Sequence, residues 1–102
     1  MRLNQVTVSV RDIDEAIAFY RRLGLRLIVR SPHYARFVCP DGGSSFSVHL
    51  CEPETAILSR TVVYFESERL DDWVAELQAQ GVRFVHGPKD QSWLWREARL
   101  TA

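Results

Sequence analysis

The chain repeats one arrangement of strand, helix and closing glycine, and this repeat constrains its fold more than any other feature. A helical pattern of apolar residues ends at Gly24, and a second such pattern ends at Gly81. Aligning the two glycines shifts one half onto the other by 57 residues, the difference between 24 and 81, and places Ile13 on Leu70. Self-similarity of this length predicts one structural unit that occurs twice.

The first half predicts a βαβββ unit. Residues 3–12 alternate apolar and short polar side chains, which is typical of a strand with one buried face. Residues 12–24 have helical spacing, with Asp12 suited to the N-cap and Gly24 to the helix end. Three further strands are expected over residues 25–30, 34–39 and 44–51, the last two joined by the turn-forming sequence PDGGS.

The second half predicts the same order with one element fewer. We expect a strand over residues 61–65, a helix over 68–81, a strand over 82–85, a loop over 86–92 and a strand over 93–100. The counterpart of the first half's last strand would fall beyond Ala102, so the second unit is predicted to lack it. We therefore interpret residues 1–102 as a single domain of two repeats, a first module over 3–51 and a truncated module over 60–102.

Charge and hydropathy argue against two classes of partner. Thirteen basic and thirteen acidic residues cancel, whereas nucleic-acid binders usually carry a basic excess. No apolar run is long enough to span a bilayer, and no charged-then-apolar leader precedes Leu3. Cys39 and Cys51 have neither the number of a disulfide scaffold nor the spacing of a metal site. We expect a cytoplasmic protein that binds neither nucleic acid nor membrane.

The stretch VSVRDIDEAIAFYRRLGLRL, within this tandem arrangement, resembles the vicinal oxygen chelate superfamily. That group contains glyoxalase I, bleomycin- and fosfomycin-resistance proteins and extradiol dioxygenases. The resemblance covers essentially the whole chain and is specific for the fold more than for the substrate. It implies an α+β fold in which tandem βαβββ modules form a curled, partly open mixed sheet around a cavity. The polar face of the first strand would then face a ligand.

The resemblance also implies positions for a metal site. Its first position lies on the opening strand, where this chain has Gln5, and its second on the fourth strand, where it has His49. The third position falls on Val62, which cannot ligate, and the fourth would lie on the missing strand. Gln5 and His49 are thus the expected ligands of one divalent ion, such as zinc, nickel, iron or manganese.

Strand alternation adds further candidates for the same cavity. Thr7 shares a face with Gln5, and Ser47 shares one with His49. In the second half, alternation assigns to the cavity Tyr64, Glu66, Trp93, Trp95 and Glu97. The aromatic residues suit the walls of a binding site, and Glu66 or Glu97 could supply a carboxylate as ligand or catalytic base.

Two functions of different classes follow. The first is a module that binds a small organic molecule without catalysis, as bleomycin-resistance proteins of the resembled superfamily do. The second is a metal-dependent lyase, isomerase or dioxygenase acting on a small substrate with vicinal oxygens. A third interpretation is a truncated relic that folds by borrowing strands. The missing last strand would leave an unpaired strand edge, which favours association with another chain. Homodimers are also common in the resembled family, so we expect a homodimer.

Overall fold

The computed structural model describes residues 1, 3–51, 62–92 and 95–100. The chain divides into two compact units, unit 1 over Met1–Arg60 and unit 2 over Thr61–Ala102. Neither of the two helices in the described residues is long and apolar enough to cross a membrane, since each has ten residues and a span needs about 20.

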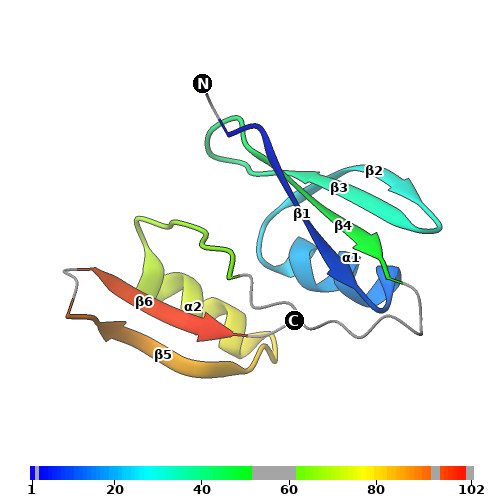
Figure 1. The fold of residues 1–102 in the computed structure, drawn as a ribbon. Coiled ribbons are helices and arrows are strands. Elements are labelled where there is room, and N and C mark those ends of the chain that lie inside the picture. The colour runs from blue at the N-terminus through cyan, green and yellow to red at the C-terminus, as the bar shows by residue number, and fades with distance from the viewer. Residues whose placement is uncertain (2, 52–61, 93–94, 101–102) are drawn as a thin grey trace. The chain divides into compact units, whose positions relative to one another are not determined.

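Unit 1 is a four-stranded sheet with one helix packed on it (Figure 1). Its elements, in chain order, are β1 (Gln5–Val10), α1 (Ile13–Arg22), β2 (Arg26–Ser31), β3 (Tyr34–Val38) and β4 (Ser45–Leu50). The strands lie in the order β1-β4-β3-β2, with β1 parallel to β4 and the other pairs antiparallel. The predicted βαβββ order of the first half is confirmed.

Helix α1 begins and ends where the local chemistry predicts. The carboxylate of Asp12 accepts a hydrogen bond of 2.9 Å from the backbone N–H of Glu15, which satisfies a donor that the first turn leaves free. After the helix, Gly24 adopts φ +102°, a conformation that residues with a Cβ rarely take. This turn directs the chain into β2.

The core of unit 1 lies between α1 and one face of the sheet. Tyr20 on the helix contacts two strand residues, with ring centroids 4.7 Å from Phe46 and 5.8 Å from Phe37. Phe37 and Val48 have no exposed surface. The other buried apolar residues of this unit are Ile13, Ala16, Ile17, Leu23, Leu25, Ala35 and Phe46. Burial of their apolar surface, at about 25 cal/mol per Å², is the main force that holds helix to sheet.

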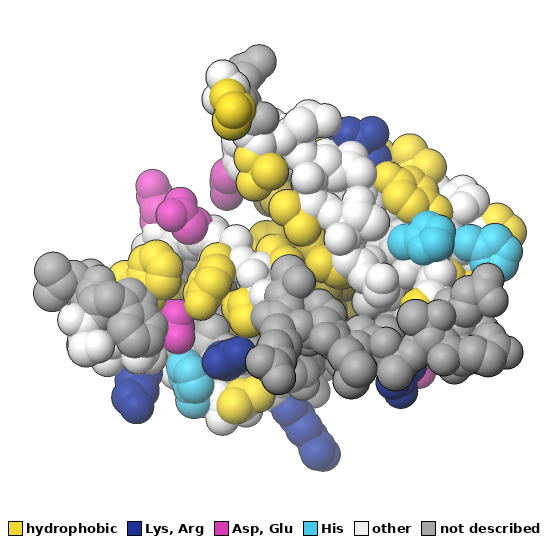
Figure 2. All heavy atoms as spheres, viewed as in Figure 1, with side chains coloured by type: hydrophobic (Ala, Val, Ile, Leu, Met, Phe, Trp, Pro, Cys, Tyr) yellow, Lys and Arg dark blue, Asp and Glu magenta, His cyan; other side chains and the backbone are white. Residues whose placement is uncertain are grey.

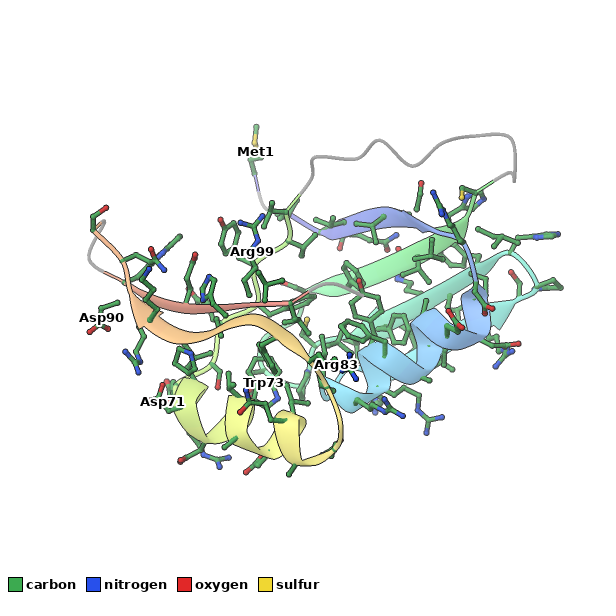
Figure 3. The ribbon with its side chains drawn as sticks, turned by 90° about the horizontal axis from the view of Figure 1, so that it is seen from below. Met1, Asp71, Trp73, Arg83, Asp90 and Arg99 are labelled. Carbon is green, nitrogen blue, oxygen red and sulfur yellow. The ribbon has the colours of Figure 1, made fainter. Side chains whose placement is uncertain are left out.

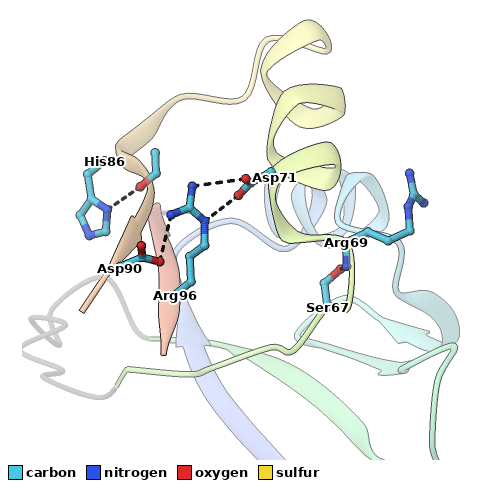
Figure 4. A network of polar contacts seen from close by, with 7 residues as sticks. Ser67, Arg69, Asp71, His86, Asp90 and Arg96 are labelled. Atoms are coloured by element: carbon cyan, nitrogen blue, oxygen red, sulfur yellow. Dashed lines mark hydrogen bonds and ion pairs between the residues drawn. The ribbon is translucent and has the colours of Figure 1, made fainter. Parts of the chain in front are cut away.

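Unit 2 contains one helix and a two-stranded antiparallel sheet. Its elements are α2 (Leu70–Ala79), β5 (Phe84–Asp90) and β6 (Arg96–Leu100). Val74 and Leu77 are the buried residues of α2. The guanidinium of Arg96 on β6 bonds the carboxylate of Asp71 on α2 at 2.9 Å and that of Asp90 on β5 at 3.1 Å (Figure 4). Arg96 thus connects helix and sheet.

Two predictions for the second half are wrong. Residues 86–90, predicted as part of a loop, continue β5. The pairing of β5 with β6 shifts register between Phe84 and His86 and again between His86 and Lys89, so the strand passes through Gly87 and Pro88 without ending. A bulge accommodates a proline that has no N–H for the ladder. Residues 62–65 of the strand predicted over 61–65 form no strand, and in the described part of unit 2 only β5 and β6 pair. Alternation predicts an extended segment but not a partner for it.

The α+β class is confirmed, with a four-stranded mixed sheet and a separate two-stranded sheet, neither of which closes on itself. The helices predicted over 12–24 and 68–81 are confirmed within two residues at each end. That the two units form a single domain of two repeats stays a prediction.

Candidate ligand-binding face

The sheet of unit 1 has a second face, opposite α1, that carries polar side chains and is here called the polar face. Residues that pair directly across neighbouring strands point to the same side. The register of β1, β4 and β3 therefore places three rows on this face: Gln5, Ser45 and Val38; Thr7, Ser47 and Arg36; Ser9, His49 and Tyr34. Figure 2 shows uncharged surface, drawn white, over the strands of unit 1.

The amide of Gln5 is the centre of a hydrogen-bond network on the polar face. Its Nε2 donates to the Oγ of Ser47 at 2.6 Å and lies 3.3 Å from both the Oη of Tyr34 and the Oγ1 of Thr7. Its Oε1 accepts a bond of 3.2 Å from the Oγ of Ser45. Both ends of the amide are therefore held, and four side chains from three strands fix its orientation.

Ser47 lies beneath this network and has no exposed surface. Its hydroxyl lies 3.0 Å from the Oγ1 of Thr7 and accepts the bond from Gln5. A buried hydroxyl without partners would lower stability by about 1–3 kcal/mol, so these bonds make a polar residue acceptable at this depth. The centre of the polar face is thus a rigid set of amide and hydroxyl groups.

Arg36 lies beside Ser47 in the same row of the polar face. Its side chain is half-buried, and its Nη2 donates a bond of 3.1 Å to the Oγ of Ser45. Its Nε is buried and has no hydrogen-bond partner among the described residues. Ser45 in turn is oriented by the carbonyl of Asn4, 3.2 Å away.

The two predicted metal ligands share the polar face but not the same row. Gln5 is level with Ser45, and His49 is four residues further along the strand, opposite Ser9 and Tyr34. At about 3.3 Å per residue their backbones are separated by about 13 Å along the strands. His49 is exposed, and the Gln5 amide is bonded to hydroxyls.

A tight metal site in proteins normally has three or more protein ligands. Within the described ranges, no three His, Cys, Asp or Glu side chains lie close enough together to hold an ion. The described residues of the polar face therefore do not fit a metal centre. The assignment of Gln5 and His49 as ligands stays a prediction that this geometry does not support.

In unit 2, the predicted aromatic residues form an exposed pair. The rings of Tyr64 and Trp95 lie 5.6 Å apart between centroids, and their exposed fractions are 63% and 52%. Trp93 lies outside the described residues. An exposed aromatic pair offers a flat apolar surface that suits stacking against a planar ligand.

The predicted carboxylates of unit 2 differ in environment. Glu66 is exposed and lies outside any strand. Glu97 lies on β6 opposite Lys89, and its buried Oε2 has no hydrogen-bond partner among the described residues. Because Arg96 bonds to α2, its strand neighbours Trp95 and Glu97 point to the face away from that helix, as alternation predicts. Figure 3 shows Arg99, two residues on, on that same side.

Tyr34 and Arg36 belong to the polar face but are not among the residues predicted from the sequence. The alternation of side chains along YARFV could have identified them. Ala35 and Phe37 are apolar residues of this strand, and both are fully buried. Tyr34 and Arg36 must then point to the other side of β3. The register that brings them beside Gln5 and Ser47 is a property of the folded sheet.

The sequence is similar to a family of known proteins and to one curated protein. Residues 2–99 match the model of the Glyoxalase/Bleomycin resistance protein/Dioxygenase superfamily. An uncharacterized protein of Mycolicibacterium smegmatis is 29% identical over 90 residues, which are 88% of this chain and 76% of that protein.

Two solved structures share the fold at low sequence identity. The bleomycin resistance determinant encoded on the transposon Tn5 has a TM-score of 0.76 at 19% identity, over 96% of this chain and 86% of that one. A bleomycin-binding protein complexed with bleomycin has a TM-score of 0.75 at 19% identity, over the same shares of the two chains.

Proposed function

This chain belongs to the glyoxalase/bleomycin resistance protein/dioxygenase superfamily, and from that premise we propose that it binds a small organic molecule at the polar face of unit 1. The observation that carries the proposal is the fixed amide of Gln5 above the buried hydroxyl of Ser47. Polar groups held in one orientation on a sheet recognise an oxygen-bearing ligand without losing side-chain freedom on binding. A relative with the same fold has been solved with bleomycin bound.

Unit 2, taken by itself, has an aromatic pair of its own. Tyr64 and Trp95 are exposed and in ring contact, and with Trp93 they are proposed to stack on a planar organic molecule. Thr7, exposed beside Gln5 and Ser47, is proposed to contact the ligand's oxygen atoms. We place this binding in the cytoplasm, because the free thiols of Cys39 and Cys51 suit a reducing compartment.

The test uses bleomycin as the first probe, followed by small polyhydroxylated and aromatic compounds. Titration into 15N-labelled protein is expected to shift the backbone amide signals of Gln5, Thr7 and Ser47. Ser47→Ala should weaken binding at least tenfold, whereas Ser9→Ala, at the far end of the polar face, should leave it unchanged. Equal affinities for both variants, or a ligand that perturbs only α1, would refute the proposed site.

A second candidate function is a metal-dependent lyase, isomerase or dioxygenase. The observation that favours it is the buried and unpartnered Oε2 of Glu97, which suits a catalytic base or ligand, with Glu66 as the other candidate. Metal analysis of protein purified without chelator tests it. Stoichiometric metal that is lost in His49→Ala would support the enzyme, and metal-free protein in both cases would favour the binding module.

We also propose that the protein is a homodimer. Strand β2 is an edge of the sheet in unit 1, and it exposes Ile28 and Val29 by 47% and 44%. Exposed apolar residues on a sheet edge favour pairing with another chain. Sedimentation at micromolar concentration should give the mass of two chains, and Val29→Lys should shift the protein toward monomer. A monomer for the unsubstituted protein would contradict the dimer.

A further inference from the structure

Arg36 has hydrogen-bonding capacity that the fold leaves unused. A guanidinium has five N–H donors in a planar fork. Among the described residues, its Nη2 donates a hydrogen bond to the Oγ of Ser45, and its buried Nε has no partner. A buried donor without a partner is unfavourable, and such a group in a native fold calls for an explanation such as a bound ligand.

The charge of Arg36 also lacks a counterpart on the polar face. The three rows from β1, β4 and β3 contain no carboxylate. The register of β2 adds Arg26 opposite Val38, which is a second positive group, and Val29 opposite Arg36. Two carboxylates of unit 1 are used elsewhere, because Asp12 caps α1 and Asp14 pairs with Arg30. The polar face therefore favours a negatively charged ligand.

We propose that Arg36 binds the carboxylate of an acidic organic ligand; this inference rests on the proposed small-molecule function. A carboxylate can accept two parallel bonds from the two terminal nitrogens of one guanidinium. The bond from Nη2 to Ser45 holds the fork in place, and the exposed hydroxyl of Thr7 is available to the ligand's uncharged oxygens. The planar fork of one guanidinium matches the two coplanar oxygens of a carboxylate.

The matched probes are benzoate and benzamide, which have the same shape and differ in charge. Each is titrated into 15N-labelled protein, and the shifts of the Ser45, Ser47 and Arg36 amides report binding at the polar face. We expect benzoate to bind at least tenfold more tightly than benzamide. Inorganic phosphate is the third probe and is expected to bind more weakly than benzoate.

Variants then assign the preference to Arg36. Arg36→Gln should abolish the tenfold preference, and Arg36→Lys, which keeps the charge but not the fork, should lose most of it. Arg22→Gln, an exposed arginine in the last turn of α1, is the control and should keep the preference in full. The dispersed amide spectrum of each variant verifies that it is folded, and the lysine variant serves if the glutamine variant is not.

The outcomes separate this inference from the proposed function. Equal affinity for benzoate and benzamide would overturn the carboxylate assignment while leaving small-molecule binding intact. Tighter binding of phosphate than of benzoate would overturn it in favour of a phosphorylated ligand. No shift with any probe at millimolar concentration would also overturn it, and the proposed function would then be decided by the bleomycin titration alone.

Discussion

The side-chain amide of Gln5 lies 2.6 Å from the hydroxyl of Ser47, although 42 positions separate the two residues in sequence. Register places Gln5 level with Ser45 and Ser47 level with Thr7, so the amide reaches forward along the neighbouring parallel strand. Glutamine is long enough for this diagonal contact. Ser47 has no exposed surface, and the contact couples β1 to β4 through side chains as well as through backbone.

Removing the buried hydroxyl should destabilise unit 1. In Ser47→Ala, the Nε2 of Gln5 and the Oγ1 of Thr7 both lose a partner at a part-buried position. We expect the free energy of unfolding to fall by about 1–3 kcal/mol, measured by urea denaturation followed by circular dichroism. Ser9→Ala removes an exposed hydroxyl from the same strand face and should change it by less than about 0.5 kcal/mol. Equal losses would contradict the importance of the network.

Burial raises the pKa of the Tyr20 phenol above its ordinary value of 10.0, because the phenolate is poorly solvated between α1 and the sheet. The folded state then holds the proton at a pH where the unfolded chain releases it. This contribution to stability is complete below pH about 10 and is lost as the pH rises through the folded pKa.

Urea denaturation between pH 8 and pH 11 tests the effect of Tyr20. The unsubstituted protein should lose stability over the upper part of this range, and Tyr20→Phe should lose less of it because no phenol must ionise. Tyr34→Phe, which removes a hydroxyl from the polar face instead, is the matched control and should keep the decline. Identical pH profiles for all three proteins would refute the role of Tyr20.

The ion pairs of Arg96 should stabilise unit 2 in a salt-dependent manner. The hydrogen bond to Asp71, and to a smaller extent the one to Asp90, raises the pKa of the Arg96 guanidinium. The guanidinium therefore keeps its charge at every relevant pH. Arg96→Gln should lower the midpoint of thermal unfolding in low salt, and the loss should shrink in 1 M NaCl, where the Debye length is about 3 Å. Arg83→Gln, at an exposed position of the same unit, is the control. A loss that salt does not reduce would show that packing, and not charge, is involved.

Gly24 should resist substitution because of its backbone conformation. At φ +102° a side chain is strained even though no atom lies within 4 Å of the position of an added Cβ. Gly24→Ala should therefore destabilise the protein by about 1–2 kcal/mol in urea denaturation. Gly43→Ala, in the turn before β4, has the same open space without the positive φ and should be nearly neutral. A neutral Gly24→Ala would mean that the turn into β2 relaxes.

Local patterns were sufficient for the elements of unit 1 and for the two helices. Asp12 caps α1 and Gly24 follows it, as the residue types predict, because capping and positive φ depend on neighbours in sequence. Pairing was less predictable. The strand expected over 61–65 required a partner that unit 2 does not place beside it, and β5 continued through Gly87 and Pro88 because β6 lies opposite.

The sequence by itself determined which side of each strand is polar, since alternation follows from the pleat of the backbone and needs no knowledge of the neighbours. Alternation alone assigned Thr7 to the face of Gln5 and Ser47 to the face of His49, and the family resemblance joined these two pairs in one cavity. Only the tertiary structure decided which polar groups meet. Register is fixed by hydrogen bonds between strands distant in sequence, and it brought Gln5 to Ser47 and Tyr34 while placing His49 two rows away.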